Sequence, residues 1–501
     1  MITYAGAPAA LCLMSLLVAG MSSCLEASAE MTEQRLLMPN AWASWVPDTA
    51  AMRDFVDAWT SRGVNGCGLQ IPWDAIEPEE GRFDWTWLDE RLDVVVDAGL
   101  RVHLRLATQN HRPGWVDSEL MCGRGGEVVG AGNWNMLSFA DPRTAGTVSS
   151  AMGAVAAHVQ QRYAHVEPHP VVCILPQFSG PAETEYAHDR WSDFSDIAQK
   201  DFRAWLRKRH GTVDEVNFRW RALYADWDQI TLQAAHPWDF NSYRTARLSA
   251  LIEACADAVH EVAGAAMGVQ FGSIWDGISV CRGTRDARAL IEHTDWVVID
   301  DYPLYDHAMS MDYLRGHAHD KMWGNEVDGP GIVPDEMGLE QCLTSLERGA
   351  RFLWVANWPA DSIRDGRWTF WEKVMAVMAE PYQPVEPDRA IVVSLATAYR
   401  QEGGQGVEGL FIGLYRRLTD GGAQPVDIIT DTVLTARPEW LARYESGLHI
   451  PSSQLWMSDE LVRALSDAPV PVYVEGDRVG LLDAYGMPRP VEDLPRSAEE
   501  R

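Results

Sequence analysis

Cysteine is scarce and scattered in this chain of 501 residues. Eight cysteines occur, and no two of them are separated by only two residues. Cys67 and Cys173 sit inside apolar runs and are typical of core residues, while Cys122 lies in a Gly-rich loop. The pattern supports neither a disulfide framework nor a zinc ribbon. No cluster of His, Cys and acidic residues has ligand spacing, so we expect no metal and no other cofactor.

Positive charge is also in short supply. The chain has four lysines and a formal net charge of -30. Nucleic acids and anionic membrane surfaces are themselves negative, so we expect neither as a partner. Tryptophan, in contrast, is abundant, with 22 residues. Flat apolar rings that carry one polar group suit the faces and hydroxyls of sugars, although several of these rings are expected to serve ordinary core packing.

The first residues have the composition of an export signal. Ala7–Ser22 is apolar but too short to span a bilayer, and Ala27-Ser28-Ala29 is a small-residue cleavage site. We therefore expect residues 1–29 to be a signal peptide and the mature protein to be periplasmic or extracellular, with no membrane span. Cys24 leaves a lipid anchor open as an alternative.

A strand-and-helix alternation then continues from about residue 35 to residue 357. Eight apolar runs have the length and β-branched content of buried strands. They are Arg35–Trp42, Val64–Ile71, Arg101–Ala107, Val171–Phe178, Met267–Gly272, Trp296–Ile299, a run near Lys321–Trp323, and Arg351–Ala356. Eight such repeats favour an α/β fold of the (β/α)8 TIM-barrel type over an open sheet, with the barrel spanning residues 30–383.

Two pairs of acidic residues follow predicted strands. Glu183 and Glu185 come just beyond strand four, after the strand-breaking Gly180-Pro181, and Glu326 and Asp328 follow strand seven. The carboxyl ends of the strands form the catalytic face of a TIM barrel. Glycoside hydrolysis needs two carboxyl groups about the scissile bond. We predict Glu183 and Glu326 as catalytic, with Glu185 an exposed neighbour and Asp328 a turn residue; Asn325 could donate a hydrogen bond to Glu326 or face solvent.

Other side chains near the same strand ends are candidates for substrate binding. Arg105, inside strand three, would be a buried cation that needs a carboxylate partner and could position one of the glutamates. The remaining candidates are hydroxyl-binding or ring-stacking residues, and for each a purely structural role is the alternative. These candidates are Asn110, His111, Trp275, Asp301, Tyr302 and Trp358, with Asp300 and Trp354 as weaker additions.

Three stretches resemble the family 42 glycoside hydrolases, the bacterial β-galactosidase-like enzymes. Residues 64–115 share Ile76-Glu77-Pro78, Trp87-Leu88-Asp89 and Pro113-Gly114-Trp115 with the opening of that family. Residues 202–228 are similar to its helical excursion after strand four, and residues 300–303 to its motif after strand six. The resemblance implies a nucleophile at Glu326, a flavodoxin-like α/β domain at residues 384–480, and homo-oligomers, trimeric or dimeric. Residues 481–501 are charged and contain proline, and we expect them to be disordered.

The chain departs from the family at one catalytic motif. Family members usually have Asn directly before the acid/base Glu, and here Ala182 precedes Glu183. The sequence from Gly180 to Tyr186 is more similar to the β-amylase motif, in which Gly-Pro-Ala leads to the acid and a Tyr follows three residues later. We therefore interpret the chain as an exported retaining exo-glycosidase, β-galactosidase-like, acting on oligo- or polysaccharides. An inverting amylase-like enzyme and a non-catalytic carbohydrate-binding barrel remain alternatives.

Overall fold

The structure is a computed structural model. It describes residues 35–130, 135–179, 183–187, 190–272, 279–300, 306–329, 334–356, 369–400, 407–421 and 424–496. The expected signal peptide lies outside these residues. None of the described helices is long and apolar enough to cross a membrane.

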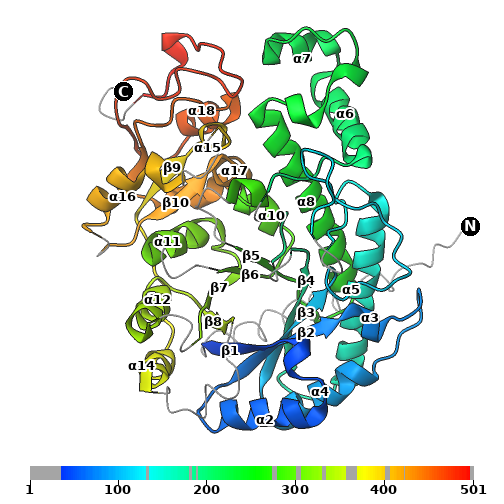
Figure 1. Cartoon of the computed structure of the whole chain (residues 1–501). Coiled ribbons are helices and arrows are strands. Elements are labelled where there is room, and N and C mark those ends of the chain that lie inside the picture. The colour runs from blue at the N-terminus through cyan, green and yellow to red at the C-terminus, as the bar shows by residue number, and fades with distance from the viewer. Residues whose placement is uncertain are drawn as a thin grey trace, which may run out of the picture.

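Eight parallel strands form the barrel predicted from the sequence (Figure 1). They are β1 (Leu36–Ala41), β2 (Gly66–Pro72), β3 (Arg101–Ala107), β4 (Val171–Gln177), β5 (Gly268–Phe271), β6 (Trp296–Asp300), β7 (Met322–Val327) and β8 (Phe352–Val355). The hydrogen-bonded order runs β4-β3-β2-β1-β8-β7-β6-β5. The ring closes through a parallel bridge between Ile174 of β4 and Met267, directly before β5. Ladder registers are continuous elsewhere, apart from a shift between β3 and β4.

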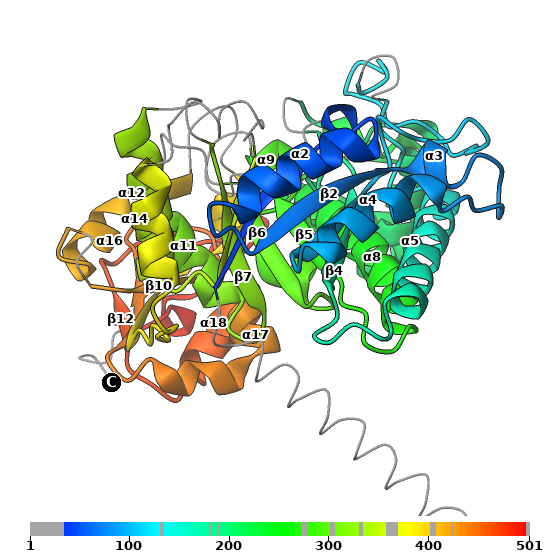
Figure 2. The same cartoon turned by 90° about the horizontal axis from the view of Figure 1, so that it is seen from below.

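Helices follow the strands and surround the barrel (Figures 1 and 2). They are α2 (Thr49–Thr60), α3 (Trp73–Ile76), α4 (Thr86–Asp97), α5 (Pro142–Arg162), α6 (Asp196–His210), α7 (Val213–Trp220), α8 (Pro237–His260), α9 (Ser279–Arg282), α10 (Ala287–Ile291), α11 (His307–His317), α12 (Asp335–Glu347) and α14 (Thr369–Met378). The Asp48 side chain caps α2 by accepting a hydrogen bond from the Ala51 N–H, as its position before the helix predicts. Helices α6 and α7 form the excursion expected after strand four.

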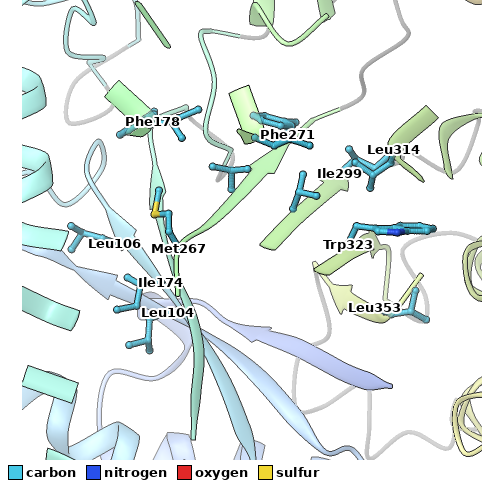
Figure 3. Packing of buried hydrophobic residues seen from close by; sticks show 14 of the residues in the cluster. Leu104, Leu106, Ile174, Phe178, Met267, Phe271, Ile299, Leu314, Trp323 and Leu353 are labelled. Atoms are coloured by element: carbon cyan, nitrogen blue, oxygen red, sulfur yellow. The ribbon is translucent and has the colours of Figure 1, made fainter. Parts of the chain in front are cut away.

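Alternate residues of each barrel strand face two different apolar clusters. The outward side chains pack against the helices, and Figure 3 shows Leu104, Ile174, Phe271 and Trp323 among them. A smaller cluster fills the barrel interior and contains Met38, Cys173, Leu175, Trp296, Val298, Phe352 and Trp354. Strand residues alternate between the two faces, so residues an even number of positions after these interior side chains also face inward. At the strand ends such residues line the mouth of the barrel. The fold thus directs Glu326 of β7 and Asp300 of β6 inward.

A second, four-stranded parallel sheet follows the barrel. Its strands are β9 (Arg389–Val393), β10 (Asp427–Thr430), β11 (Gly447–Ile450) and β12 (Val472–Val474), in the order β10-β9-β11-β12. In chain order this is 2-1-3-4, the doubly wound order of flavodoxin-like folds. Its helices are α15 (Leu395–Ala398), α16 (Ile412–Leu418), α17 (Asp431–Ala436) and α18 (Asp459–Ser466). All four strands lie within residues 384–480, where the family resemblance implied a flavodoxin-like α/β domain.

The C-terminal segment differs from the prediction. Residues 481–496, which we expected to be disordered, pack onto the rest of the chain. Leu482 bridges Trp456, the Tyr485 hydroxyl donates to Asp239 Oδ1 at 2.9 Å, and Arg489 Nη1 lies 2.6 Å from Asp459 Oδ1. Charge and proline content alone missed this segment because its partners lie on distant elements; Asp239 is in α8, more than 240 residues earlier. Residues 497–501 lie outside the described part of the chain.

Candidate active site

Glu326 lies in the barrel mouth near the end of β7. It is 3% exposed, and its Oε2 accepts hydrogen bonds from Arg105 Nη2 at 2.5 Å and Gln270 Nε2 at 2.9 Å. A guanidinium and an amide donor on the same oxygen hold this buried carboxyl group in one orientation. The preceding residue, Asn325, does not help, because its side chain donates to Ser345 Oγ of α12 at 2.9 Å on the opposite face of the strand. Our expectation that Asn325 bonds Glu326 or faces solvent is therefore wrong.

Arg105 reaches Glu326 from inside β3, across the barrel. Its side chain is 1% exposed, and its guanidinium lies 4.8 Å from the ring centroid of Trp354 and 5.4 Å from that of Trp42. Its Nε donates to His103 Nε2 at 3.1 Å. The buried cation thus has the carboxylate partner that the sequence required, and that partner is one of the two predicted catalytic glutamates.

Glu183 lies in the segment that follows β4. Its Oε2 accepts a hydrogen bond from the Ser179 hydroxyl at 2.7 Å, and its carbonyl accepts from the N–H groups of Phe178 and Ser179, both at 2.9 Å. These bonds tie Glu183 to the residues directly after β4. The next residue, Thr184, donates its N–H to the Gln270 carbonyl of β5. Glu183 is 2% exposed and is therefore held against the β4–β5 side of the mouth.

Glu185 is not the exposed neighbour that we expected. It is fully buried, accepts a hydrogen bond from the Gly272 N–H at 3.0 Å and pairs with Arg282 Nη1 at 2.7 Å. Burial raises the pKa of Glu185 to about 8, with Arg282 opposing the shift and the charge of Glu183 adding to it. The sequence suggested solvent because Glu185 stands in an acidic, turn-rich loop. The cation that accompanies it in the interior comes from α9, 97 residues later.

Asp300 joins the same end of the barrel. It pairs in register with Glu326 on the neighbouring strand, so both side chains point into the mouth. Its pKa is raised well above the usual range, first by burial and then by the negative charges of Glu326 and Glu183. Asp328 has its pKa raised by burial and by Glu326. One end of the barrel therefore gathers Glu183, Glu326 and Asp300 within electrostatic reach of one another.

The remaining predicted residues fall into two groups. His111 lies beyond β3, with Nδ1 3.5 Å from Asp74 Oδ1, and it is partly exposed. Asn110 precedes it in the same turn, and its Oδ1 is buried. The structure thus places both at the strand ends without joining them to either glutamate among the described contacts. Trp275, Asp301, Tyr302 and Trp358 lie outside the described residues.

Sequence reasoning missed a set of polar side chains inside the barrel. Gln70 of β2 donates to Gln177 Oε1 of β4 at 2.8 Å, and Gln270 of β5 bonds Glu326. Asn40 of β1 is 1% exposed. A usable signal existed, because each of these residues interrupts an otherwise apolar strand close to its C-terminal end. Polar residues at that position line the mouth of a TIM barrel.

A parallel barrel with buried carboxyl groups at its C-terminal mouth is the architecture of the TIM-barrel glycosidases. Residues 38–325 match the model of glycoside hydrolase family 42, described as beta-galactosidase. The match covers more than half of the chain, which therefore belongs to this family. The matched stretch ends directly before Glu326.

Individual relatives agree with this assignment. The beta-galactosidase bgaB of Geobacillus kaustophilus is 28% identical over 204 residues, which are 38% of this chain and 27% of that protein. Two solved structures share the fold. The cold-adapted beta-galactosidase of Rahnella sp. R3 has a TM-score of 0.70 at 19% identity, covering 91% of this chain and 73% of that one. The catalytic domain of a beta-amylase from Paenibacillus polymyxa has a TM-score of 0.57 at 14% identity, covering 70% and 100%.

Proposed function

We propose that this protein is a retaining exo-glycoside hydrolase of β-galactosidase type that removes terminal sugars from oligo- or polysaccharides. Family membership supports the reaction class, and the beta-galactosidase relatives support galactose as the sugar. The sequence alignment spans only 27% of the Geobacillus protein's length, so the sugar rests on analogy. The observation that carries the proposal is the buried contact of Arg105 with Glu326 at the barrel mouth, where Glu183 is buried in the segment after β4.

The proposed reaction is a double displacement. Glu326, oriented by Arg105 and Gln270, attacks the anomeric carbon and forms a glycosyl ester. Glu183 gives its proton to the glycosidic oxygen as the bond to the leaving group breaks. Glu183 then removes a proton from water, which attacks the same carbon and frees Glu326.

Glu183, and not Glu185, is the proposed acid/base for a geometric reason. The charge of Glu183 acts on Asp300, beside Glu326, whereas Glu185 is engaged by Arg282 and the Gly272 N–H. One property of Glu185 favours the opposite assignment, because a carboxyl group with a pKa of about 8 is protonated at neutral pH. The two assignments make different predictions, which are set out in the Discussion.

The test of the function uses two readouts on the full chain. A panel of nitrophenyl glycosides, with the first product anomer followed by NMR, is expected to show cleavage of a β-galactoside with retained configuration. A 2-deoxy-2-fluoro glycoside is expected to label Glu326, in the peptide that spans residues 322–330. The matched control is Asp328→Asn, which should still be labelled. An inverted product without any label would indicate the amylase-like mechanism, and sugar binding without turnover would indicate a non-catalytic barrel.

We also propose that the protein is exported and forms homo-oligomers. The composition of residues 1–29 supports export, and the family resemblance supports the oligomer. Fractionation of cells that express the full chain, combined with mass spectrometry of the mature N-terminus, tests the first proposal. Light scattering of the purified protein tests the second, and a monomer at micromolar concentration would contradict it.

A further inference from the structure

His103 occupies an unusual place inside the barrel. It lies on β3 two residues before Arg105, is fully buried, and its ring stacks on Trp354 of β8 at 3.8 Å between centroids and an interplanar angle of 19°. Burial, and then the charge of Arg105, hold the pKa of His103 well below its usual range. The ring is therefore neutral. Its Nε2 faces the Arg105 Nε–H at 3.1 Å, so Nε2 carries the lone pair and Nδ1 the proton.

Space for this ring is made by a glycine on the neighbouring strand. Gly68 of β2 pairs in register with His103. A Cβ atom at Gly68 would stand 2.3 Å from His103 Nε2 and 2.4 Å from Asn40 Oδ1. Both distances are far inside van der Waals contact, so only glycine leaves the acceptor nitrogen where it is. The lack of a side chain at Gly68 of β2 therefore makes the space that the His103 ring of β3 occupies.

We propose that His103 is a positioning residue for the nucleophile: its Nε2 fixes the guanidinium of Arg105, which in turn aims the carboxylate of Glu326. The contacts of the guanidinium with the rings of Trp42 and Trp354 are not directional hydrogen bonds and leave its rotation in its own plane free. The bond to His103 fixes Arg105 Nε, and the planar group then directs Nη2 at Glu326 Oε2. The neutral ring is essential, because an imidazolium has no lone pair to accept the bond.

This inference rests on the proposed role of Glu326, and it concerns a residue that touches neither substrate nor reacting atoms. Its effect is expected on the step that forms the glycosyl ester. A nucleophile displaced by about 1 Å loses up to about 100-fold in rate, while the sugar contacts that set KM are unchanged. A purely structural role would instead lower stability and leave the intrinsic rate unaltered.

The experiment measures the inactivation rate constant with a 2-deoxy-2-fluoro glycoside, together with kcat and KM. His103→Leu keeps the bulk against Trp354 but removes the acceptor. We expect inactivation and kcat to fall about 10- to 100-fold, with KM changed less than about threefold. His103→Gln places an amide oxygen near the position of Nε2 and is expected to restore most of the rate. Gly68→Ala displaces the ring from the other side and should reproduce the loss.

The matched control is another buried neutral histidine. His317 of α11 bonds the Tyr313 carbonyl and Thr430 Oγ1, away from the barrel interior. His317→Leu is expected to lower the thermal midpoint without changing the inactivation rate measured below that midpoint. A His103→Leu protein that is inactivated as fast as the wild type would overturn the inference, as would a Gln variant no better than the Leu variant. If Glu326→Ala stays active, the proposed function fails. If Glu326→Ala is inactive but His103→Leu is as active as the wild type, only the inference about His103 fails.

Discussion

At the scale of single residues, the structure brings together side chains whose partners are far apart in sequence. Arg105 was predictable as a buried cation in need of an acid, because it interrupts an apolar strand. Its partner Glu326 lies 221 positions later, and only the closed barrel shows that the two meet. The burial of Glu185 could not be predicted for the same reason, since Arg282 and the Gly272 N–H reach it through tertiary structure.

The assignment of the acid/base residue is decided by two variants. Glu183→Ala is expected to lose activity on substrates with poor leaving groups, by about 10²-fold or more, because proton donation is lost. External azide should restore turnover of an activated aryl glycoside, since a small anion can replace water once the general base is gone. Glu185→Ala is expected to reduce activity through the loss of the Arg282 pair, without azide rescue. Azide rescue of Glu185→Ala alone would transfer the role to Glu185.

Catalysis is expected to be independent of metal ions, because two carboxyl groups suffice for the reaction. Dialysis against EDTA should leave kcat unchanged, with the wild type in plain buffer as the control. Loss of activity that zinc or calcium restores would contradict the two-carboxylate mechanism.

At the scale of elements, the eight barrel strands were predictable from apolar runs, because parallel strands buried on both faces are nearly continuous in hydrophobicity. Strand seven was the exception. We expected it near Lys321–Trp323, and β7 extends to Val327. Its second half, Gly324-Asn325-Glu326, carries no apolar signal, because Gly324 allows close packing against β8 and Glu326 belongs to the site. The polar side chains inside the barrel were missed for the same reason, because site residues interrupt the apolar pattern of a strand.

Gly324 gives a test of this close packing. A Cβ atom there would stand 2.4 Å from the Phe352 carbonyl oxygen of β8. Because a backbone atom cannot move aside easily, Gly324→Ala is expected to cost about 1–3 kcal/mol of unfolding free energy. Urea unfolding measures the change. Gly146→Ala, in α5 with open space at its Cβ, should be neutral or stabilising. Equal effects of the two changes would show that β7 and β8 do not approach so closely.

At the scale of the whole molecule, the second sheet is joined to the barrel by buried polar contacts. Arg315 of α11 bonds Asp427 of β10 at 2.8 Å, and Asp286, the N-cap of α10, accepts from Thr432 Oγ1 of α17 at 2.7 Å. Figure 1 shows the second sheet beside α10 and α11. The family resemblance implied an α/β domain here, but the sequence could not predict this junction, because pairings over more than 100 residues leave no local pattern.

The stability of the second domain is expected to depend on pH through Asp431 of α17. Burial, with a contribution from the charge of Asp286, raises the pKa of Asp431 from 3.8 to about 7. Between these values the folded protein holds a proton that the unfolded chain releases. The free energy of unfolding therefore falls as pH rises from about 4 to about 7, by on the order of 1 kcal/mol per pH unit at most.

Asp431→Asn removes this dependence while keeping acceptor and donor atoms for the Leu395 N–H and the Ser458 hydroxyl. We expect the variant to gain stability over the wild type as pH is raised from 5 to 8, measured by urea unfolding at each pH. Asp477→Asn, at an exposed aspartate of the same domain, is the control and should follow the wild type. A difference between Asp431→Asn and the wild type that stays constant with pH would contradict the expectation.

The way in which β4 and β5 close the barrel affects which part of it unfolds locally first. The other neighbouring strands are paired in ladders, whereas β4 and β5 are joined by the Ile174–Met267 bridge and by the bonds between Thr184 and Gln270. The segment that carries Glu183 thus serves as part of the seam of the barrel. In hydrogen–deuterium exchange, the amides of residues 183–186 and 266–272 are expected to exchange before those of β1–β3. A bound sugar that contacts Glu183 would stabilise the contact between β4 and β5. Sugar binding should therefore slow amide exchange on these strands even where the ligand barely touches them.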